Sequence, residues 1–381
     1  MSSPRRQIYQ TLGLIAPLGF APIAIHFGLF DILAKIDQSA SGQSVLNHVC
    51  ESSKDKSVQA PRMIKSDYLI PTLADPSSPS TEDTLVAMAA LSWVDRVDDG
   101  LFAPNEITRF LATNPPVVHG ILLYTTEGLL ASAFLMRQMT ATEFKYPFTR
   151  LQTPMQYAHR MMGNERLAAM HTYSIMAAEG RMPSFNTFME GRHSGDQTPY
   201  NILTSLGYDL DAVIGDARSQ GLPVTMVDIG GGRGQLLLEL KNKIPGLRPE
   251  DLILEEFNPD ITEVPGVTLV QWDYAKEGSP QPIPGALVYH LSHILHNLPD
   301  LDAGQLLQKL SAAMAPYSRI LIYERRLDAV LGANASMAVL FGGREIIEGE
   351  WHQLAEVAGL KVAFQAYPSG TGRGLIEMRK V

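Results

Sequence analysis

The second half of the chain alternates between short β-rich runs and helical runs, and this constrains its fold more than any other feature. From about residue 223, strands are indicated by "VTMVDI", "DLILEE", "VTLVQWD", "ALVYHL" and "RILIYE", and helices by "QLLLELKNKI", "LDAGQLLQKLSAAM" and "EGEWHQLAEVAG". Such alternation predicts an α/β fold with a parallel sheet and helices on both of its faces. The last stretch, "LKVAFQAYPSGTGRGLIEMRKV", predicts two strands joined by a Gly-rich turn, and hence an antiparallel final pair.

The first half of the chain is predicted to be mainly helical. Apolar residues recur at helical spacing in "FGLFDILAKI", "GILLYTTEGLLASAFLMRQM" and "ERLAAMHTYSIMAAEG". The stretch "TLVAMAALSWVDRVDDGLFAPNEITRFLA" indicates a helix, a hairpin around Asp98–Gly100 and another helix, which is the outline of a winged helix. With 381 residues the chain is long enough for two domains, which we place at residues 1–175 and 176–381.

Composition excludes some classes of partner and compartment. The formal net charge of −9 argues against binding to nucleic acid, which needs a basic face. A single cysteine, Cys50, excludes an intrachain disulfide framework and indicates a reducing compartment. The apolar run after "MSSPRR" keeps a helical period, so we interpret it as an amphipathic helix rather than a signal peptide. No uncharged apolar segment elsewhere has membrane-spanning length, and we expect a cytoplasmic protein that binds no membrane.

The stretch "VTMVDIGGGRGQLLLEL" predicts a strand, a Gly-rich turn and a helix. Glycine allows the backbone to approach a ligand closely because it has no Cβ. A dinucleotide fingerprint would need a third glycine where Gln235 stands. The D-x-G-G-G-x-G spacing fits a loop for S-adenosylmethionine (SAM) better, although a tight turn without a ligand is the plain alternative.

A SAM site would use the ends of three successive strands. The aspartate that ends the first strand and the glycine loop after it would hold the amino-acid part of the cofactor. The acidic end of "LILEEF" would lie near the ribose hydroxyls, and "QWDY" would lie near the adenine. The predicted cofactor-binding residues are Asp228, Gly230, Gly232, Glu255, Glu256, Asp273 and Tyr274.

Nearly the whole chain resembles the fungal and plant small-molecule O-methyltransferases. The resemblance rests on "VDIGGGRG", "HILHNLPD", "RILIYERRL" and "LFGGREIIEGEW". It implies a class I SAM-methyltransferase fold: a Rossmann-like catalytic sheet over residues 176–381, and a helical, winged-helix-like part over residues 1–175 that covers the substrate and forms a homodimer. The family's catalytic histidine, in segments like "RHILHDWPD", falls on His296, and its two supporting glutamates fall on Glu324 and Glu345.

A histidine supported by carboxylates suits the transfer of a methyl group to oxygen. A phenol has a pKa of about 10, so a base that removes its proton during attack assists the reaction. A carboxylate on the second ring nitrogen fixes the tautomer and stabilises the imidazolium. His296 with Glu324 and Glu345 has this form. We interpret His290 and His293 as core residues, and we assign no metal ion to the site.

The segment around His296 departs from the family pattern. Ser292, Asn297 and Leu298 stand where relatives carry Arg, Asp and Trp. These changes indicate a reshaped pocket and resemble the leporin-type fungal pericyclases, an offshoot that keeps SAM as an electrostatic cofactor without consuming it. In that offshoot a histidine of the N-terminal domain binds the substrate, and His119 is the candidate here. The resemblance thus favours a pericyclase that dehydrates or cyclises a polyketide-derived substrate.

Two alternatives to the pericyclase stay open. The first is an ordinary O-methyltransferase that acts on a phenolic or enolic natural product, with His296 as general base. The second is a SAM-sensing winged-helix regulator, which the acidic charge balance disfavours. An apolar, adaptable substrate pocket is suggested by the methionine content, although methionines are more often core residues. The predicted pocket residues are Met155, Met162, Met176, Met337 and Asn297.

Overall fold

The computed structural model describes residues 3–35, 40–41, 81–191, 198–257, 261–327, 331–367 and 372–381. The chain folds into two compact units. The first unit contains Met1–Leu130 and Arg181–Gly191, and the second contains Ala131–Gly180 and Arg192–Val381. Their limits differ from the predicted domains: residues 131–175 pack with the sheet unit, and the boundary after residue 175 lies inside α12 (Thr172–Ala178). The segment Arg181–Gly191 belongs to the first unit because its helix α13 (Met182–Glu190) packs on α8 (Pro115–Leu123).

The second unit is built on a seven-stranded sheet with the order β6-β5-β4-β7-β8-β10-β9. Neighbouring strands from β6 to β8 are parallel, and β10 is antiparallel to both β8 and β9, as the sequence predicts. The strands are β4 (Met226–Ile229), β5 (Leu252–Glu256), β6 (Thr268–Gln271), β7 (Val288–Ser292), β8 (Arg319–Arg325), β9 (Leu360–Ala366) and β10 (Arg373–Lys380).

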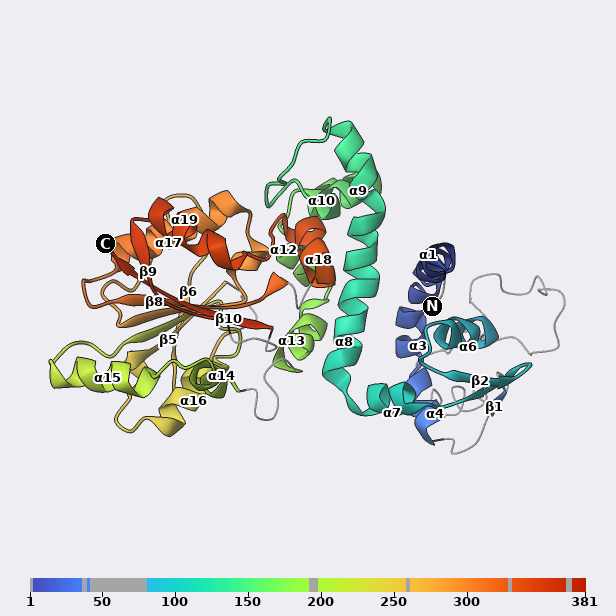
Figure 1. Cartoon of the computed structure of the whole chain (residues 1–381), viewed down its shortest axis with the longest axis horizontal. Helices are drawn as coiled ribbons and strands as arrows, with labels where there is room; N and C mark the ends of the chain where they lie inside the picture. The colour runs from blue at the N-terminus through green and yellow to red at the C-terminus, as the bar shows by residue number, and fades with distance from the viewer. Residues whose placement is uncertain are drawn as a thin grey trace. The chain divides into compact units, whose positions relative to one another are not determined.

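Helices cover both faces of this sheet (Figure 1). One face packs on α17 (Asp300–Ala313) and α19 (Trp351–Val357), with the fully buried Trp351 in its core. The other face packs on α14 (Pro199–Ser205), α15 (Leu210–Ser219) and α16 (Gln235–Lys243). Successive strand residues alternate between the two cores, since side chains along a strand point to opposite faces: Val227 joins the first core and Met226 the second.

The remaining helices of the second unit lie outside these two layers. They are α9 (Leu129–Ala141), α10 (Pro154–Met161), α11 (Glu165–Ala168), α12 and α18 (Leu331–Phe341). The hydroxyls of Thr153 and Thr172 both donate to the Leu340 carbonyl, which ties α18 to the starts of α10 and α12. Short 3-10 turns complete the unit at Pro249–Asp251, Leu295–Asn297 and Glu348–Glu350.

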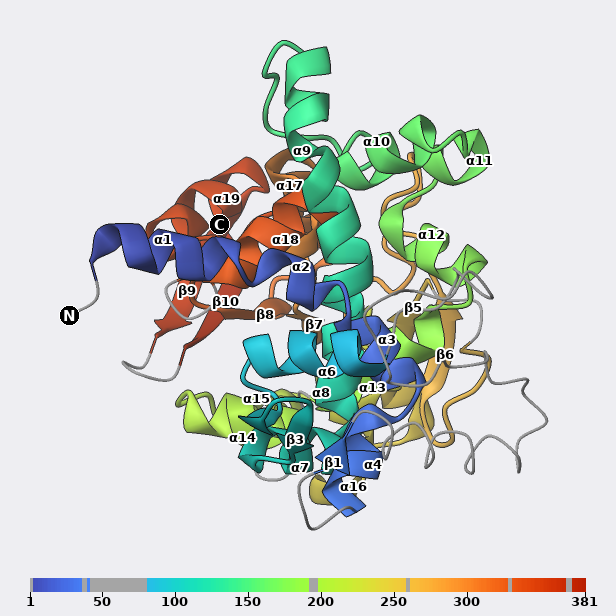
Figure 2. The ribbon, with the colours of Figure 1, turned by 90° about the vertical axis from the view of Figure 1, so that its right-hand side faces the viewer.

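The first unit contains the predicted winged-helix outline. The hairpin of β2 (Asp95–Asp98) and β3 (Leu101–Ala103) follows α6 (Thr81–Ala90) and precedes α7 (Glu106–Thr113), and β3 also pairs with β1 (Ala40–Ser41). The helices before this hairpin are α1 (Pro4–Leu12), α2 (Ile15–Leu18), α3 (Ala21–His26) and α4 (Leu29–Lys35). Figure 2 shows α3, α4, α6 and α7 gathered beside the hairpin, around a shared apolar core that includes Leu33, Leu85 and Phe102.

Within the described residues, one helical stretch, Pro115–Ala141, is long and apolar enough to cross a membrane by length and composition alone. It contains α8, a π-helical turn at Tyr124–Gly128 and α9. A single helix of this kind is weak evidence, because core helices of soluble proteins share these properties. The stretch also carries Glu127, which forms an ion pair with Arg181 at 3.0 Å. The expected absence of membrane binding therefore stays a prediction.

Candidate active site

The candidate catalytic residues meet at the carboxyl ends of two adjacent parallel strands. In the register of β7 and β8, Ser292 pairs with Tyr323, so His293 and Glu324 follow at the same edge of the sheet. Ligands of open α/β sheets bind at this carboxyl edge. The His293 N–H donates to the Tyr323 carbonyl at 3.0 Å. Parallel pairing thus brings together two segments that lie far apart in the sequence.

The backbone turns sharply after β7. His293 has a φ of 56°, a left-handed conformation that is uncommon for a residue other than glycine. The 3-10 turn Leu295–Asn297 follows and carries His296. One oxygen of Glu324, Oε1, accepts the N–H of Leu295 at 3.0 Å and that of His296 at 3.4 Å. This carboxylate therefore holds the turn that presents His296.

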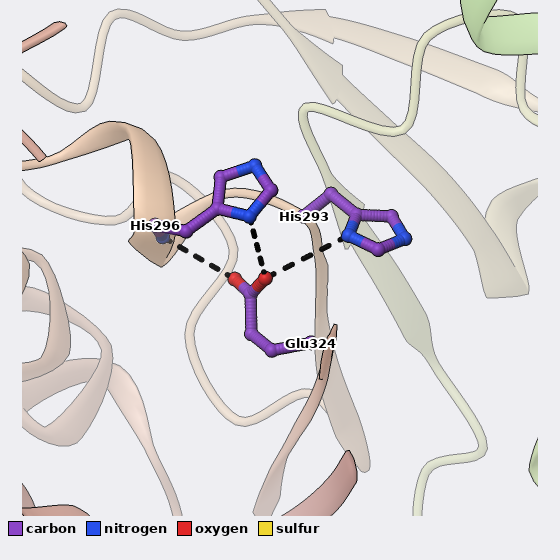
Figure 3. A group of neighbouring side chains, drawn as sticks. All are labelled: His293, His296 and Glu324. Carbon is purple, nitrogen blue, oxygen red and sulfur yellow. Dashed lines mark hydrogen bonds and ion pairs between the residues drawn. The ribbon is translucent and has the colours of Figure 1, made fainter. Parts of the chain in front are cut away.

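His296 lies between two buried carboxylates. Its Nδ1 is 3.1 Å from Oε2 of Glu324 and 3.2 Å from Oε1 of Glu345. Figure 3 shows the Glu324 carboxylate facing the rings of both His296 and His293, and His293 Nδ1 lies 3.7 Å from the same oxygen. The carboxylates occupy Nδ1 of His296, so Nε2 is the ring nitrogen left for chemistry.

Glu345 reaches His296 from the loop that follows α18. Its backbone N–H donates to the Asn334 side chain at 2.7 Å, which anchors the loop to the helix. The loop also passes close to the His296 backbone at Gly343, where a Cβ would lie 2.2 Å from the His296 carbonyl oxygen. Only glycine allows this approach. The glycines of "LFGGREI" thus let the second carboxylate come within reach of His296.

The ion pairs set the charge of the site. Burial alone would lower the pKa of His296, but the carboxylates of Glu324 and Glu345 outweigh it and raise the pKa to about 9. Burial would raise the pKa of Glu324, yet the facing His296 and His293 hold it well below its ordinary value. The site therefore stabilises an imidazolium between two carboxylates.

The glycine loop joins β4 to α16 at the same edge of the sheet. Gly230, Gly232 and Gly234 all have φ values between 60° and 71°, which favour glycine. The Gly232 N–H donates to Oε2 of Glu256 at 3.0 Å. A Cβ added to Gly232 would meet nothing nearer than 4.0 Å, whereas one on Gly231 would collide with Asp228. The loop thus packs on Asp228 and leaves open space beside Gly232, as a cradle for a ligand requires.

The two predicted ribose-binding glutamates have different surroundings. Glu256 lies at the loop and accepts the N–H groups of Gly232 and Phe257. Glu255 is buried and accepts from the Gln281 side chain at 2.9 Å, and burial raises its pKa to about 7. Glu256 lies at the loop and is only partly buried, whereas the Glu255 side chain is buried and bound to Gln281, so Glu256 fits the predicted ribose contact better.

The other predicted cofactor residues lie along the same strand ends. Asp228 is buried, and its Oδ1 lies 2.7 Å from Nδ1 of His290 on the neighbouring strand. Asp273 accepts the Ala275 N–H at 2.9 Å, in the turn after β6. The Tyr274 carbonyl accepts from Lys309 at 2.8 Å. The residues present therefore fit a SAM molecule that extends from the glycine loop past Glu256 toward Asp273, although their individual roles stay predictions.

The predicted pocket residues are distributed unevenly. Met155, Met176 and Met337 are buried in the second unit, whereas Met162 is 53% exposed. His119 belongs to the first unit, where its Nδ1 lies 2.8 Å from the Ser184 hydroxyl. The structure therefore groups His296, Glu324 and Glu345 directly, and leaves the roles of His119 and the methionines as predictions.

Two of the three altered positions near His296 have structural roles. Leu298 packs in the apolar core beneath α17, and the Asn297 side chain donates to the His293 carbonyl at 3.0 Å. Sequence reasoning placed His290 and His293 in the core. Both are buried, but each also faces a carboxylate, Asp228 and Glu324 respectively. The alternation of β7 alone could not reveal these partners, since they come from other strands.

The chain is similar to fungal methyltransferases over almost its whole length. An O-methyltransferase domain model matches residues 210–361. "O-methyltransferase aunE" of Aspergillus niger is 42% identical over 378 residues, which cover 99% of this chain and 96% of that protein. "O-methyltransferase bfoE" of Aspergillus brasiliensis is likewise 42% identical, with the same two shares covered.

Solved structures share the fold at lower sequence identity. A structure described as "A Pericyclic Reaction enzyme" has a TM-score of 0.74 at 20% identity, over 100% of this chain and 90% of that one. The crystal structure of OxaC in complex with SAH and oxaline has a TM-score of 0.76 at 18% identity, over 98% of this chain and 87% of that one. These likenesses establish the fold.

The open space beside Gly232 predicts that a side chain there blocks SAM. Gly232→Ala should weaken SAM binding at least tenfold in calorimetry, because the added Cβ enters the space where backbone and ligand meet. Gly221→Ala is the matched control: Gly221 also has a positive φ, 66°, and has no atom within 4 Å of an added Cβ. Each change should cost about 1 kcal/mol of stability. Equal SAM affinity in the two variants would show that the loop does not hold the cofactor.

Proposed function

Because the chain belongs to the O-methyltransferase family, we propose that it methylates a phenolic or enolic hydroxyl of a fungal secondary metabolite, with His296 as the general base. The family depends on SAM, and the enzyme shares its fold and cofactor. When bound, SAM supplies an electrophilic methyl group. The observation that carries the proposal is the position of His296 Nδ1, 3.1 Å and 3.2 Å from two buried carboxylates.

The carboxylates give His296 a definite task. Their oxygens lie beside Nδ1 and favour a proton there, so the lone pair of the neutral ring is on Nε2, which receives the proton of the substrate hydroxyl. The resulting imidazolium is stabilised by Glu324 and Glu345 without any rearrangement. Both carboxylates are fixed beforehand, one by the turn at Leu295 and the other by Asn334 through the Glu345 backbone. Such preorganisation lowers the barrier to proton removal.

The raised pKa of His296 brings the base close to the strength that a phenol requires. Moving a proton from a phenol with a pKa of about 10 to a base with a pKa of about 9 is uphill by about 1 kcal/mol. With the ordinary histidine pKa of 6.5 the same transfer would cost about 5 kcal/mol. At pH 7, however, only on the order of 1% of such a base is neutral. We therefore expect an alkaline optimum.

A pericyclase is the second candidate function. It is supported by the altered positions Ser292, Asn297 and Leu298, and by the shared fold with a pericyclic-reaction enzyme. In this case SAM would remain unconsumed and His119 would contact the substrate. Methyl transfer is the better-supported function, because the constellation around His296 is complete and Asn297 and Leu298 have structural roles.

The two functions predict different fates of SAM. With hydroxylated aromatic polyketides as substrates, mass spectrometry should detect products with one added methyl group, and one S-adenosylhomocysteine per product. His296→Ala should lower the rate by at least about a hundredfold, the usual contribution of a general base. His352→Ala, an exposed position on α19, should retain the wild-type rate. A product that is isomerised or dehydrated while SAM is untouched would identify a pericyclase instead.

The pH dependence of the rate should reveal the carboxylate pair. The value of kcat/KM should rise with pH up to about 9 as His296 loses its proton. Glu345→Gln removes one anion, so the pKa of His296 falls and the rise should shift to lower pH by about one unit, with a lower plateau rate. Glu348→Gln changes an exposed carboxyl three residues away and should leave the profile in place. If Glu345→Gln leaves the pH profile of kcat/KM unchanged, Glu345 does not raise the pKa of His296 as proposed.

We further propose a homodimer built by the N-terminal helices, as the family resemblance implies. In and after α1, Ile8, Tyr9, Leu12 and Ile15 are each more than half exposed, and exposed apolar patches mark interfaces. Light scattering should give a dimer mass at micromolar concentration, and a monomer mass for the double variant Ile8→Glu, Leu12→Glu. Gln10→Glu, an exposed polar position on α1, should leave the dimer intact. A monomer mass for the wild-type protein would refute the proposal.

A further inference from the structure

We propose that His293, His296 and Glu324 form a binding site for one zinc ion, and that zinc bound there inhibits the enzyme. The binding of zinc depends only on the geometry of the three side chains. The inhibitory part rests on the proposed function of His296. The proposed methyl transfer uses no metal ion. Zinc would therefore bind residues that serve catalysis and would only inhibit them.

The three side chains converge closely enough to share one ion. One possible ligand atom from each lies within 4.8 Å of the others, and all three residues are buried. Oε2 of Glu324 is 3.1 Å from His296 Nδ1 and 3.7 Å from His293 Nδ1, with both rings facing the carboxylate (Figure 3). Zinc bonds of about 2.0–2.2 Å at tetrahedral angles place neighbouring ligand atoms about 3.4 Å apart. The distances from Glu324 Oε2 to the two Nδ1 atoms, 3.1 Å and 3.7 Å, lie on either side of this value.

The ligand types also favour zinc. Imidazole nitrogen and carboxylate oxygen are common zinc ligands, and structural sites combine four of them. Glu345 lies outside this group of three but adds a second negative charge beside it, since its Oε1 is 3.2 Å from His296 Nδ1. The charges of the ligating Glu324 and the neighbouring Glu345 together balance that of Zn²⁺.

The ligands are held in place by contacts outside the cluster. Glu324 Oε1 is held by the Leu295 and His296 N–H groups, which leaves Oε2 directed toward the two rings. The backbone of His293 is fixed on both sides, because its N–H donates to Tyr323 and its carbonyl accepts from Asn297. Outer contacts of this kind orient metal ligands and raise affinity. Little reorganisation is therefore needed when zinc binds.

Zinc bound to His296 Nδ1 would inactivate the general base, because it would fix the tautomer that carries its proton on Nε2. A neutral imidazole has one lone-pair nitrogen and one N–H. When zinc binds Nδ1 of an imidazolium, the Nδ1 proton is released to solvent and the Nε2 proton stays. When zinc binds a neutral ring, the ring proton moves from Nδ1 to Nε2 with no net release. Nε2 can then no longer accept a proton from the substrate hydroxyl. Inhibition should therefore not be overcome by raising the substrate concentration.

The first test is calorimetry with Zn²⁺ on chelator-treated, full-length protein. The wild type should bind one zinc ion per chain. His293→Asn removes one ligand and should weaken binding at least tenfold. Asparagine is the appropriate replacement because it tolerates the left-handed backbone at this position. His352→Asn removes an exposed histidine elsewhere and should bind zinc as the wild type does. A melting curve of each variant confirms that it is folded.

The second test is inhibition by Zn²⁺, measured against the metal-free rate of each variant. Zinc should inhibit the wild type and His352→Asn at the concentration that fills the site, and inhibit His293→Asn only at concentrations at least tenfold higher. Chelation should restore activity. Equal zinc affinity in the wild type and His293→Asn, or no binding to the wild type, would overturn the site. If zinc binds as expected while no substrate is methylated, the site stands and the proposed function fails.

Discussion

The buried carboxylate of Glu324 is the constraint on which the rest of the site depends. Its Oε1 accepts the N–H groups of the turn that carries His296, and its Oε2 faces Nδ1 of the same histidine. One side chain thus fixes both the backbone and the ring of the base. Removing one member of a buried ion pair typically costs about 3–5 kcal/mol, so the fold of this edge and the charge of His296 are linked.

The sheet explains why distant segments of the sequence can form one site. The parallel strands β4, β5, β7 and β8 all end at the same edge. Glu256 and Glu324 therefore lie at the ends of their own strands, beside Gly232 and His293, which follow β4 and β7. The cofactor cradle is thereby next to the catalytic residues without any long-range signal in the sequence. Close approach then depends on glycine, both in the loop after β4 and at Gly343 beside His296.

Much of this arrangement could be predicted from local patterns. The strand runs, the antiparallel final pair, the hairpin near Asp98 and the glycine loop all have signals within one short stretch of sequence each, and the structure contains each of them. The grouping of His296 with Glu324 and Glu345 came from the family resemblance, and the structure brings these three together.

Other features depend on register and packing, which no local pattern contains. Spacing could not distinguish Glu255 from Glu256, because only the strand's orientation decides which carboxylate is buried against Gln281. Nor could it pair His290 with Asp228, since that contact needs the β4–β7 register. The limits of the two units were missed for a similar reason: α13 packs on α8, more than sixty residues earlier in the chain.

The central claim is that two carboxylates hold His296 as a strong base with its Nδ1 engaged. The most direct measurement is a titration of the His296 ring nitrogens by nitrogen-15 NMR in metal-free protein, with His296→Asn to assign the signals. The account predicts that the proton of the neutral ring stays on Nδ1 and that the titration midpoint lies near a pKa of about 9. A midpoint at or below the ordinary value of 6.5, or a neutral ring protonated on Nε2, would contradict it.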